Sequence, residues 1–309
     1  MERSMIIRPC DVEATSTEPD AEVIEIGAYD IRDGHLYTTG YHTFVKPAAP
    51  IPPASSAVHH LTDADVADAP AWNVAWRKLV ELDPEYEGEE LIFAAHFAQY
   101  ERQFFDPLVK ARWIDTWKCA LRQWPELDGH KLQELRYSLR LLDHPKAMPA
   151  LAMPPHRALP DAYLCGFLVI ELLKHQPIEI LIQWSEEPAV FSKFDFGKFS
   201  GKPLSAADDG FLTWMLDKDF SDDWKWNIRR EIERRITAKR KEALDLMLPA
   251  IAGAASVTDL ENWYHGSGPY LAKHAILIGS PEYDTLIQAC AARKKALIEG
   301  GQPQFGATS

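Results

Sequence analysis

Hydrophobic and polar residues alternate in the first third of the chain in the way typical of strands. Residues 21–31 alternate over a full strand length, and Asp33-Gly34 is a dipeptide that favours a tight hairpin turn. Residues 91–95, by contrast, are continuously apolar, which predicts a strand buried on both faces. The pattern predicts two further strands, at 36–45 and 113–116.

Apolar residues at helical spacing follow these strands. Tyr100, Phe104 and Phe105 recur at the spacing of a helix directly after residues 91–95. Pro160 is tolerated only in the first turn of a helix, so a helix is expected to begin just before it and to run through residue 173. Further helices are expected from Ser55, and at 63–68, 132–142, 208–218, 222–241, 244–251, 257–264 and 281–297. The chain is therefore expected to be an α/β protein.

Two carboxylates lie close together on the first expected strand. The apolar run at 5–7 and a break at Pro9 precede Asp11 and Glu13, which are two positions apart and therefore project from the same side of a strand. Two unit charges about 4 Å apart repel by about 4 kcal/mol at an effective dielectric near 20. Such a pair predicts a cation between them, and oxygen ligands suit Mg²⁺ or Mn²⁺ better than zinc.

Two further acids and a histidine fall where strands end and helices begin. Glu101 is expected in the first turn of the helix after 91–95, and Asp161 in the first turn of the helix that contains Pro160. His156 comes just before that helix. Taken singly, each has an ordinary explanation as a helix-start acid or a surface histidine. Because open α/β sheets place their sites at strand ends, the group as a whole predicts a functional site.

Composition narrows the classes of function. The 309 residues predict about two domains, at roughly 150 residues each. The net charge of −13 argues against a general polyanion binder, but it leaves open a nuclease whose acids surround metal ions. The sequence contains no signal-peptide core and no apolar segment of membrane length, so a cytoplasmic protein without membrane contact is expected. Neither a zinc site nor a disulfide framework is indicated by the widely spaced cysteines Cys10, Cys119, Cys165 and Cys290.

Four segments together resemble the motifs of DEDDh-type 3′–5′ exonucleases. The resemblance covers about residues 1–176, and the order and spacing of the segments make it specific. It rests on Asp11-x-Glu13-x-Thr15, Val58-His59-His60-Leu61-Thr62-Asp63, His96 to Glu101, and His156-Arg157-Ala158-Leu159-x-Asp161-Ala162. The resemblance implies a ribonuclease H-like α/β fold, in which a mixed five-stranded sheet carries helices on both sides.

The resemblance also implies roles for single residues. Asp11, Glu13 and Asp161 would hold one divalent ion, and Asp11 would bridge to a second ion that Glu101 supports. Two Mg²⁺ or Mn²⁺ ions per active site would stabilise charge during an in-line displacement at phosphorus. His156 would act as the general base that takes a proton from the attacking water. The expected product is a 5′-nucleoside monophosphate released from a 3′ end.

The second motif departs from the family pattern at two positions. The family usually has His-Asn followed by Phe-Asp, whereas this chain has His96-Phe97 and Tyr100-Glu101. Glutamate carries one more methylene than aspartate, about 1.5 Å of reach, which a water-mediated ligand absorbs more easily than a direct one. We therefore expect Glu101 still to serve the second metal. Phe97 in place of Asn leaves the local substrate contact open.

Contacts to nucleic acid are expected from both halves of the chain. Thr15 and His59 lie within the matching segments and are expected to touch the substrate. Residues 225–241 contain eight basic residues and two glutamates, which makes them the one clear basic stripe of an acidic chain. A solvated helix face explains such a stripe equally well. The basic residues expected to contact phosphates are Arg229, Arg230 and Arg234.

Three regions are expected along the chain. Residues 1–180 would form the exonuclease domain, and residues 190–241 resemble the small C-terminal module of the exodeoxyribonuclease X branch of the family. Residues 242–309 would form a helical extension of unknown role. The amphipathic helix expected at 281–297 could meet a second copy or another protein, although covering the preceding module is the favoured interpretation.

The leading interpretation is a metal-dependent 3′–5′ exonuclease that acts on DNA, with a preference for single-stranded 3′ ends. A 3′–5′ exoribonuclease is the nearest alternative, because the same motifs serve RNA-trimming enzymes and no residue in the sequence reads the 2′-hydroxyl. A catalytically weak subunit that binds nucleic acid or protein is the alternative from another class. Glu101 and the unassigned extension are the features that favour it.

Overall fold

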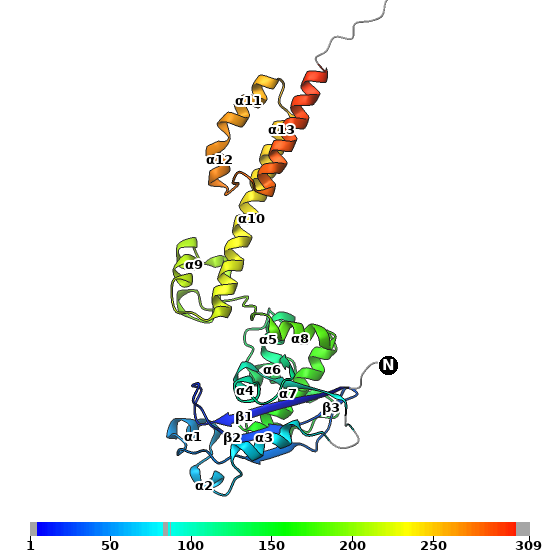
Figure 1. Cartoon of the computed structure of the whole chain (residues 1–309), viewed down its shortest axis with the longest axis vertical. Helices are drawn as coiled ribbons and strands as arrows, with labels where there is room; N and C mark the ends of the chain where they lie inside the picture. Colours follow the sequence, from blue (N-terminus) through cyan, green and yellow to red (C-terminus); the bar gives the residue numbers. More distant parts are fainter. Residues whose placement is uncertain (1–4, 83–85, 87, 301–309) are drawn as a thin grey trace, which may run out of the picture. The chain divides into compact units, whose positions relative to one another are not determined.

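The computed structural model describes residues 5–82, 86 and 88–300. The chain divides into two compact units, Met1–Pro203 and Leu204–Ser309 (Figure 1). The division falls inside the segment 190–241 that the sequence groups as one module. Each unit is described by itself below.

The first unit is built on a mixed sheet with β1 (Met5–Ala14) at its centre. β1 pairs in parallel with β6 (Glu90–Ala95) and antiparallel with β2 (Val23–Ala28), and the order of the longer strands is β5-β2-β1-β6-β7. The outer strands are β5 (Tyr41–Phe44) and β7 (Arg112–Asp115). Two short strands, β3 (Ile31–Arg32) and β4 (His35–Leu36), extend the sheet beside the first half of β1. The expected mixed five-stranded sheet is confirmed, with these two short strands added.

β1 runs through Pro9, where the sequence suggested a break. The β1 residues that pair antiparallel with neighbouring strands are Ile7, opposite β3, and the residues from Cys10 onward, opposite β2. Pro9 lies between these two ladders, where a missing N–H is tolerated, and its carbonyl still accepts a hydrogen bond from the Tyr29 N–H at 3.0 Å. One continuous strand therefore carries the apolar run and both acids.

The return strand expected at 36–45 is split. Asp33 and Gly34 both have positive φ, 50° and 73°, as a two-residue hairpin turn requires. β4 ends at Leu36, and the chain then leaves β3 and rejoins the sheet as β5, which pairs with β2. The turn is therefore confirmed, and the segment after it pairs first with β3 and then with β2.

Helices cover both faces of the sheet (Figure 1). In β6 the buried side chains alternate: Ile92 and Ala94 pack into one core, and Phe93 and Ala95 pack into the other, which confirms the strand buried on both faces. The first core is completed mainly by α7 (Ala158–Leu173), and the second by α3 (Trp72–Val80) and α4 (Gln99–Phe105). The other α-helices among the described residues of this unit are α1 (Pro53–His59), α2 (Asp63–Val66), α5 (Thr116–Gln123), α6 (Leu132–Ser138) and α8 (Ile178–Glu186).

The start of α7 lies directly on β2. A Cβ atom added at Gly27 would lie 2.2 Å from the Leu159 backbone nitrogen, so only glycine permits this approach. The contact brings the first turn of α7 over the part of the sheet where β1 carries Asp11. Residues far apart in the sequence thus meet at one point of the sheet.

The second unit is helical. It contains α9 (Asp209–Leu216), α10 (Asp222–Ala252), α11 (Val257–Gly266), α12 (Gly268–Lys273) and α13 (Pro281–Gly300). The helices expected at 222–241 and 244–251 are one continuous helix, α10, which ends just after Pro249. Leu286 of α13 is buried in a core that it shares with α10 and α11. Among the described residues, no helix is both long enough and apolar enough to cross a membrane.

Candidate metal centre

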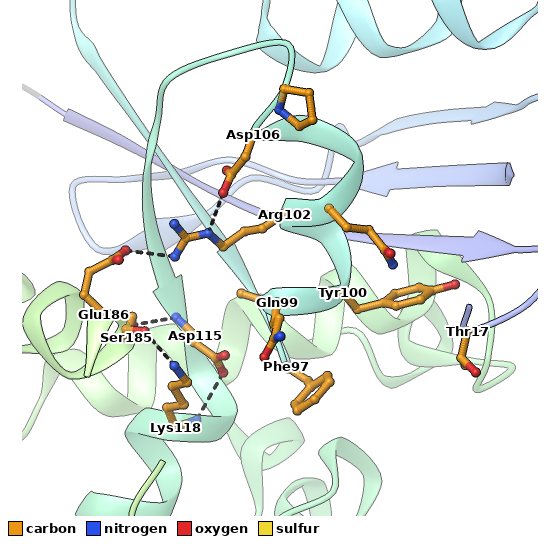
Figure 2. A pocket seen from close by; sticks show the side chains of 13 residues that line it. Thr17, Phe97, Gln99, Tyr100, Arg102, Asp106, Asp115, Lys118, Ser185 and Glu186 are labelled. Carbon is orange, nitrogen blue, oxygen red and sulfur yellow. Dashed lines mark hydrogen bonds and ion pairs between the residues drawn. The ribbon is translucent and has the colours of Figure 1, made fainter. Parts of the chain in front are cut away.

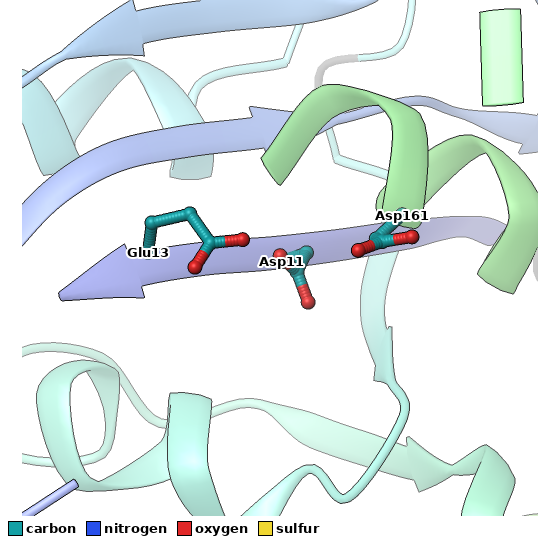
Figure 3. A group of neighbouring side chains, drawn as sticks. All are labelled: Asp11, Glu13 and Asp161. Atoms are coloured by element: carbon teal, nitrogen blue, oxygen red, sulfur yellow. The ribbon is translucent and has the colours of Figure 1, made fainter. Parts of the chain in front are cut away.

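Three carboxylates converge where α7 crosses β1. Asp11 and Glu13 project from the same side of β1, as the two-residue spacing predicts, and Asp161 comes from the first turn of α7 (Figure 3). One oxygen from each of these side chains lies within 4.8 Å of the others. Asp11 and Asp161 are 150 positions apart in the sequence, so the fold assembles the group.

These carboxylates repel one another. Burial, and then the charges of neighbouring acids, raise the pKa of Asp11 well above its usual value and that of Glu13 to about 8. Burial also raises the pKa of Asp161, although hydrogen bonds to its carboxylate oppose the rise. A divalent cation among the three groups would remove this cost. The donors are all carboxylate oxygens, the ligand type that Mg²⁺ and Mn²⁺ prefer, so the residues present fit such an ion.

Asp161 is held in place by two hydrogen bonds. The backbone N–H of His156 donates to Oδ2 at 2.8 Å, and the side-chain amide of Gln133 donates to Oδ1 at 3.1 Å. Gln133 lies on α6, and nothing in its residue type or spacing identifies it from the sequence. The two donors restrict the carboxylate to an orientation in which it faces β1.

Glu101 lies near the three carboxylates but outside their group. It is in the first turn of α4, as expected, and only 2% of its surface is exposed. Its Oε2 atom has no hydrogen-bond partner in the part of the chain that the structure describes. Burial, opposed by a backbone hydrogen bond, and then the charges of Asp115 and Glu13 raise its pKa well above the usual value. A buried carboxylate with an unpartnered oxygen beside other acids fits a ligand to a second ion.

His156 occupies the short segment just before α7. Its backbone is left-handed, with φ at 58°, a conformation uncommon for residues other than glycine. The hydrogen bond from its N–H to Asp161 holds this conformation, and the side chain is exposed. Strained backbone of this kind is typical of functional sites.

Thr15 and His59 are both buried and each accepts a hydrogen bond from a backbone N–H. Thr15 is buried, and its hydroxyl accepts a hydrogen bond from the Glu22 N–H at 2.9 Å. His59 is 2% exposed, and its Nδ1 accepts from the Leu61 N–H at 3.0 Å. Burial lowers the pKa of His59. Neither residue belongs to the group of converging carboxylates, and the buried Nε2 atom of His59 has no hydrogen-bond partner among the described residues.

A fifth acid, Glu25, lies next to the group and was missed by sequence reasoning. Glu25 on β2 is fully buried directly opposite Glu13 on β1. It accepts two hydrogen bonds from Arg157, at 2.7 and 2.9 Å, and lies 2.6 Å from His42 Nε2. The sequence carried one signal for it, a glutamate in the middle of the apolar run of β2.

A pocket of about 640 Å³ is lined largely by the start of α4 and the residues around it (Figure 2). Tyr100 lines it, and burial together with the charges of Glu101, Glu13 and Asp11 raises the pKa of this tyrosine. Phe97, with φ at 70° and 46% of its surface exposed, stands in the pocket wall against Trp117, with the ring centroids 5.0 Å apart. The other lining residues are Thr17, Ala98, Gln99, Arg102, Gln103, Asp106, Pro107, Asp115, Lys118, Ser185 and Glu186.

Comparison with known proteins identifies the family. The family model RNase_T, described as Exonuclease, matches residues 10–166, about half of the chain. The chain belongs to this exonuclease family. The matched range contains all five residues that the motifs single out: Asp11, Glu13, Glu101, His156 and Asp161.

Two relatives and one solved structure are similar to this exonuclease over different shares of its length. Exodeoxyribonuclease 10 of Escherichia coli strain K12 is 32% identical over 205 residues, which are 63% of this chain and 84% of that protein. The PolC-type DNA polymerase III of Thermotoga petrophila is 30% identical over 158 residues, 49% of this chain and 11% of that protein. A solved structure of exonuclease X with 5′ overhanging duplex DNA has 27% identity and a TM-score of 0.47, covering 58% of this chain and 99% of that chain.

The basic stripe of the exonuclease lies on α10, outside the range that the family model matches. Arg229 and Arg230 are exposed, and the Arg230 guanidinium lies 5.4 Å from the centre of the Trp226 ring. Arg234 is also exposed, but Glu231 holds it through two hydrogen bonds of 2.7 and 2.8 Å. The stripe is therefore less basic at Arg234 than its sequence suggests.

Proposed function

We propose that this chain is a metal-dependent 3′–5′ exonuclease that hydrolyses DNA to 5′-nucleoside monophosphates. The observation that carries the proposal is the convergence of Asp11, Glu13 and Asp161 within 4.8 Å, in a chain of the exonuclease family. DNA is the proposed substrate because a relative that matches along 84% of its own length is an exodeoxyribonuclease.

The carboxylates would hold two Mg²⁺ or Mn²⁺ ions. Asp11, Glu13 and Asp161 would bind one ion, and Asp11 with Glu101 would bind the other. When bound, the ions would stabilise charge on the attacking and leaving oxygens of the phosphodiester. Glu101 suits this role because its buried Oε2 atom lacks a hydrogen-bond partner among the described residues.

His156 would remove the proton from the attacking water. Histidine can accept and release a proton near neutral pH. His156 is exposed, and its backbone N–H is bonded to Asp161, so the residue is next to one of the three carboxylates. The water oxygen forms a bond to the phosphorus of the terminal nucleotide, and the bond to the 3′ oxygen of the preceding nucleotide breaks. The 3′ oxygen leaves with the bonding electron pair and takes a proton from solvent, so a 5′-nucleoside monophosphate is released and the shortened strand ends in a new 3′-hydroxyl.

The second unit would contribute phosphate contacts through α10. Arg229 and Arg230 are exposed on this helix, and Trp226 beside Arg230 offers a ring on which a base could stack. Arg234 would contribute less, because it already pairs with Glu231. These contacts are independent of base identity, so they would hold DNA of any sequence.

The test is a degradation assay with matched substrates. Purified protein and an Asp161→Asn control are incubated with 3′-labelled single-stranded DNA, duplex DNA and RNA, each with Mg²⁺, Mn²⁺ or a chelator. We expect the wild type to release labelled 5′-mononucleotides from DNA, single strands fastest, only with a metal, and the control to release none. Faster release from RNA would replace the DNA assignment with an exoribonuclease, and no release from any substrate would favour a binding subunit.

A further inference from the structure

An ion pair between the buried Glu25 and the partly exposed Arg157 joins β2 to the residue just before α7. The Arg157 guanidinium donates to both Glu25 oxygens, and the Ala158 backbone N–H donates to Glu25 Oε2 at 3.2 Å. His42 Nε2 lies against Oε1. Each carboxylate oxygen thus has two partners, which uses its lone pairs and leaves Glu25 unsuited to bind a metal directly.

The pair lies next to the residues proposed to bind metal. Glu25 is directly opposite Glu13 in the antiparallel ladder, so it is anchored to the same part of the sheet. Arg157 stands between His156 and the first residue of α7, whose first turn contains Asp161. A contact between Glu25 and Arg157 therefore fixes the start of α7 relative to the strand pair that carries Asp11 and Glu13.

We propose that Glu25 and Arg157 are positioning residues for the metal centre. Their ion pair fixes the start of α7 on β2 and so holds Asp161 at ligand distance from Asp11 and Glu13. The inference rests on the proposed function. Loss of Arg157 leaves the buried Glu25 carboxylate without its cation, and loss of either partner frees the helix start to move. Loss of a group that orients a ligand costs about 10- to 100-fold in metal affinity.

A second carboxylate–arginine pair provides a matched control. Asp30, just after β2, accepts hydrogen bonds from Arg8 at 2.7 and 3.0 Å, and one from Arg32 at 2.9 Å. Its side chain is 13% exposed, so it too is largely buried. Asp30 has no contact with α7 among its hydrogen bonds to described residues, so its loss weakens the fold without loosening the start of that helix.

The experiment measures Mn²⁺ affinity and thermal unfolding of the full chain. The variants are Glu25→Gln, Arg157→Gln, their double variant, Asp30→Asn and Asp161→Asn. We expect each single change at the pair to weaken Mn²⁺ binding about 10- to 100-fold. The double variant should bind Mn²⁺ no more weakly than the worse single variant, because both changes remove the same contact. Asp30→Asn should lower the melting temperature and leave Mn²⁺ affinity unchanged.

Three outcomes would overturn the inference. A folded Glu25→Gln protein with wild-type Mn²⁺ affinity would show that the pair does not position the ligands. Additive losses in the double variant would show that the two residues act separately, and an equal loss in Asp30→Asn would reduce the effect to general loosening of the fold. If wild type and Asp161→Asn bind Mn²⁺ equally, the proposed metal centre itself is wrong. The Asp161→Asn variant therefore distinguishes a wrong metal centre from a wrong role for the Glu25–Arg157 pair.

Discussion

Glu13 and Glu25 face each other across β1 and β2, yet their charges should affect stability in opposite directions. Burial, and then the charges of Asp161 and Glu25, raise the pKa of Glu13 from 4.5 to about 8. Burial would also raise the pKa of Glu25, but hydrogen bonds from His42 and Arg157 outweigh it and lower that pKa to about 2. In metal-free protein at pH 8, Glu13→Gln should therefore stabilise the fold and Glu25→Gln should destabilise it.

The size of each stability change follows from the difference in pKa between the folded and the unfolded chain. Each pH unit of pKa difference corresponds to about 1.4 kcal/mol, so the rise at Glu13 corresponds to about 5 kcal/mol, and about half of that once water screens the half-buried charge. Folded Glu13 keeps its proton to higher pH than the unfolded chain does, so metal-free stability is lost as pH rises from 4.5 to about 8. Glu25 contributes about 3 kcal/mol above pH 4.5, which is lost as pH falls towards 2.

Thermal unfolding in a chelator at pH 4.5, 6 and 8 measures both effects. Glu13→Gln should gain roughly 5–10 °C over wild type at pH 8 and lose that gain at pH 4.5, since one kcal/mol moves the melting temperature of a unit of this size by about 2–4 °C. Glu25→Gln should melt below wild type at pH 8. Adding Mn²⁺ should raise the melting temperature of wild type and raise that of Glu13→Gln much less. A Glu13→Gln protein less stable than wild type at pH 8 in chelator would refute the electrostatic argument.

Three further predictions concern activity and binding. Glu101→Asp should change the rate of mononucleotide release and the dependence of that rate on Mg²⁺ and Mn²⁺. If the rate and its metal dependence are unchanged, Glu101 is not a ligand. His156→Asn should lower kcat by about 100-fold or more and leave Mn²⁺ affinity near that of wild type, and an active variant would exclude this side chain as the base. Arg230→Gln should weaken DNA binding for every sequence and flatten the salt dependence of that binding. Arg234→Gln should have a smaller effect, because Glu231 already pairs with this arginine. An unaltered salt slope for Arg230→Gln would exclude α10 from the DNA contact.

Local patterns in the sequence were enough to predict most of the fold. Residues 91–95 form β6 because a continuous apolar run can be buried on both faces, and the first turn of α7 holds Asp161 because proline is confined to that position. Asp11 and Glu13 share a face because strand side chains alternate. Such patterns depend on neighbours a few residues apart, which the sequence displays directly.

Features that depend on distant partners could not be predicted in this way. β1 continues through Pro9 because two different strands pair on either side of it, and their register is not visible in the sequence. The Glu25 ion pair joins residues 132 positions apart. The pairing of Arg234 with Glu231 spans only three positions, so helical spacing could have revealed this ion pair.

The most direct test of the central claim is anomalous diffraction from crystals of this protein grown with Mn²⁺. The account predicts a strong Mn²⁺ peak among the carboxylates of Asp11, Glu13 and Asp161, and a second between Asp11 and Glu101. A map with Mn²⁺ bound elsewhere and no peak among these carboxylates would contradict it.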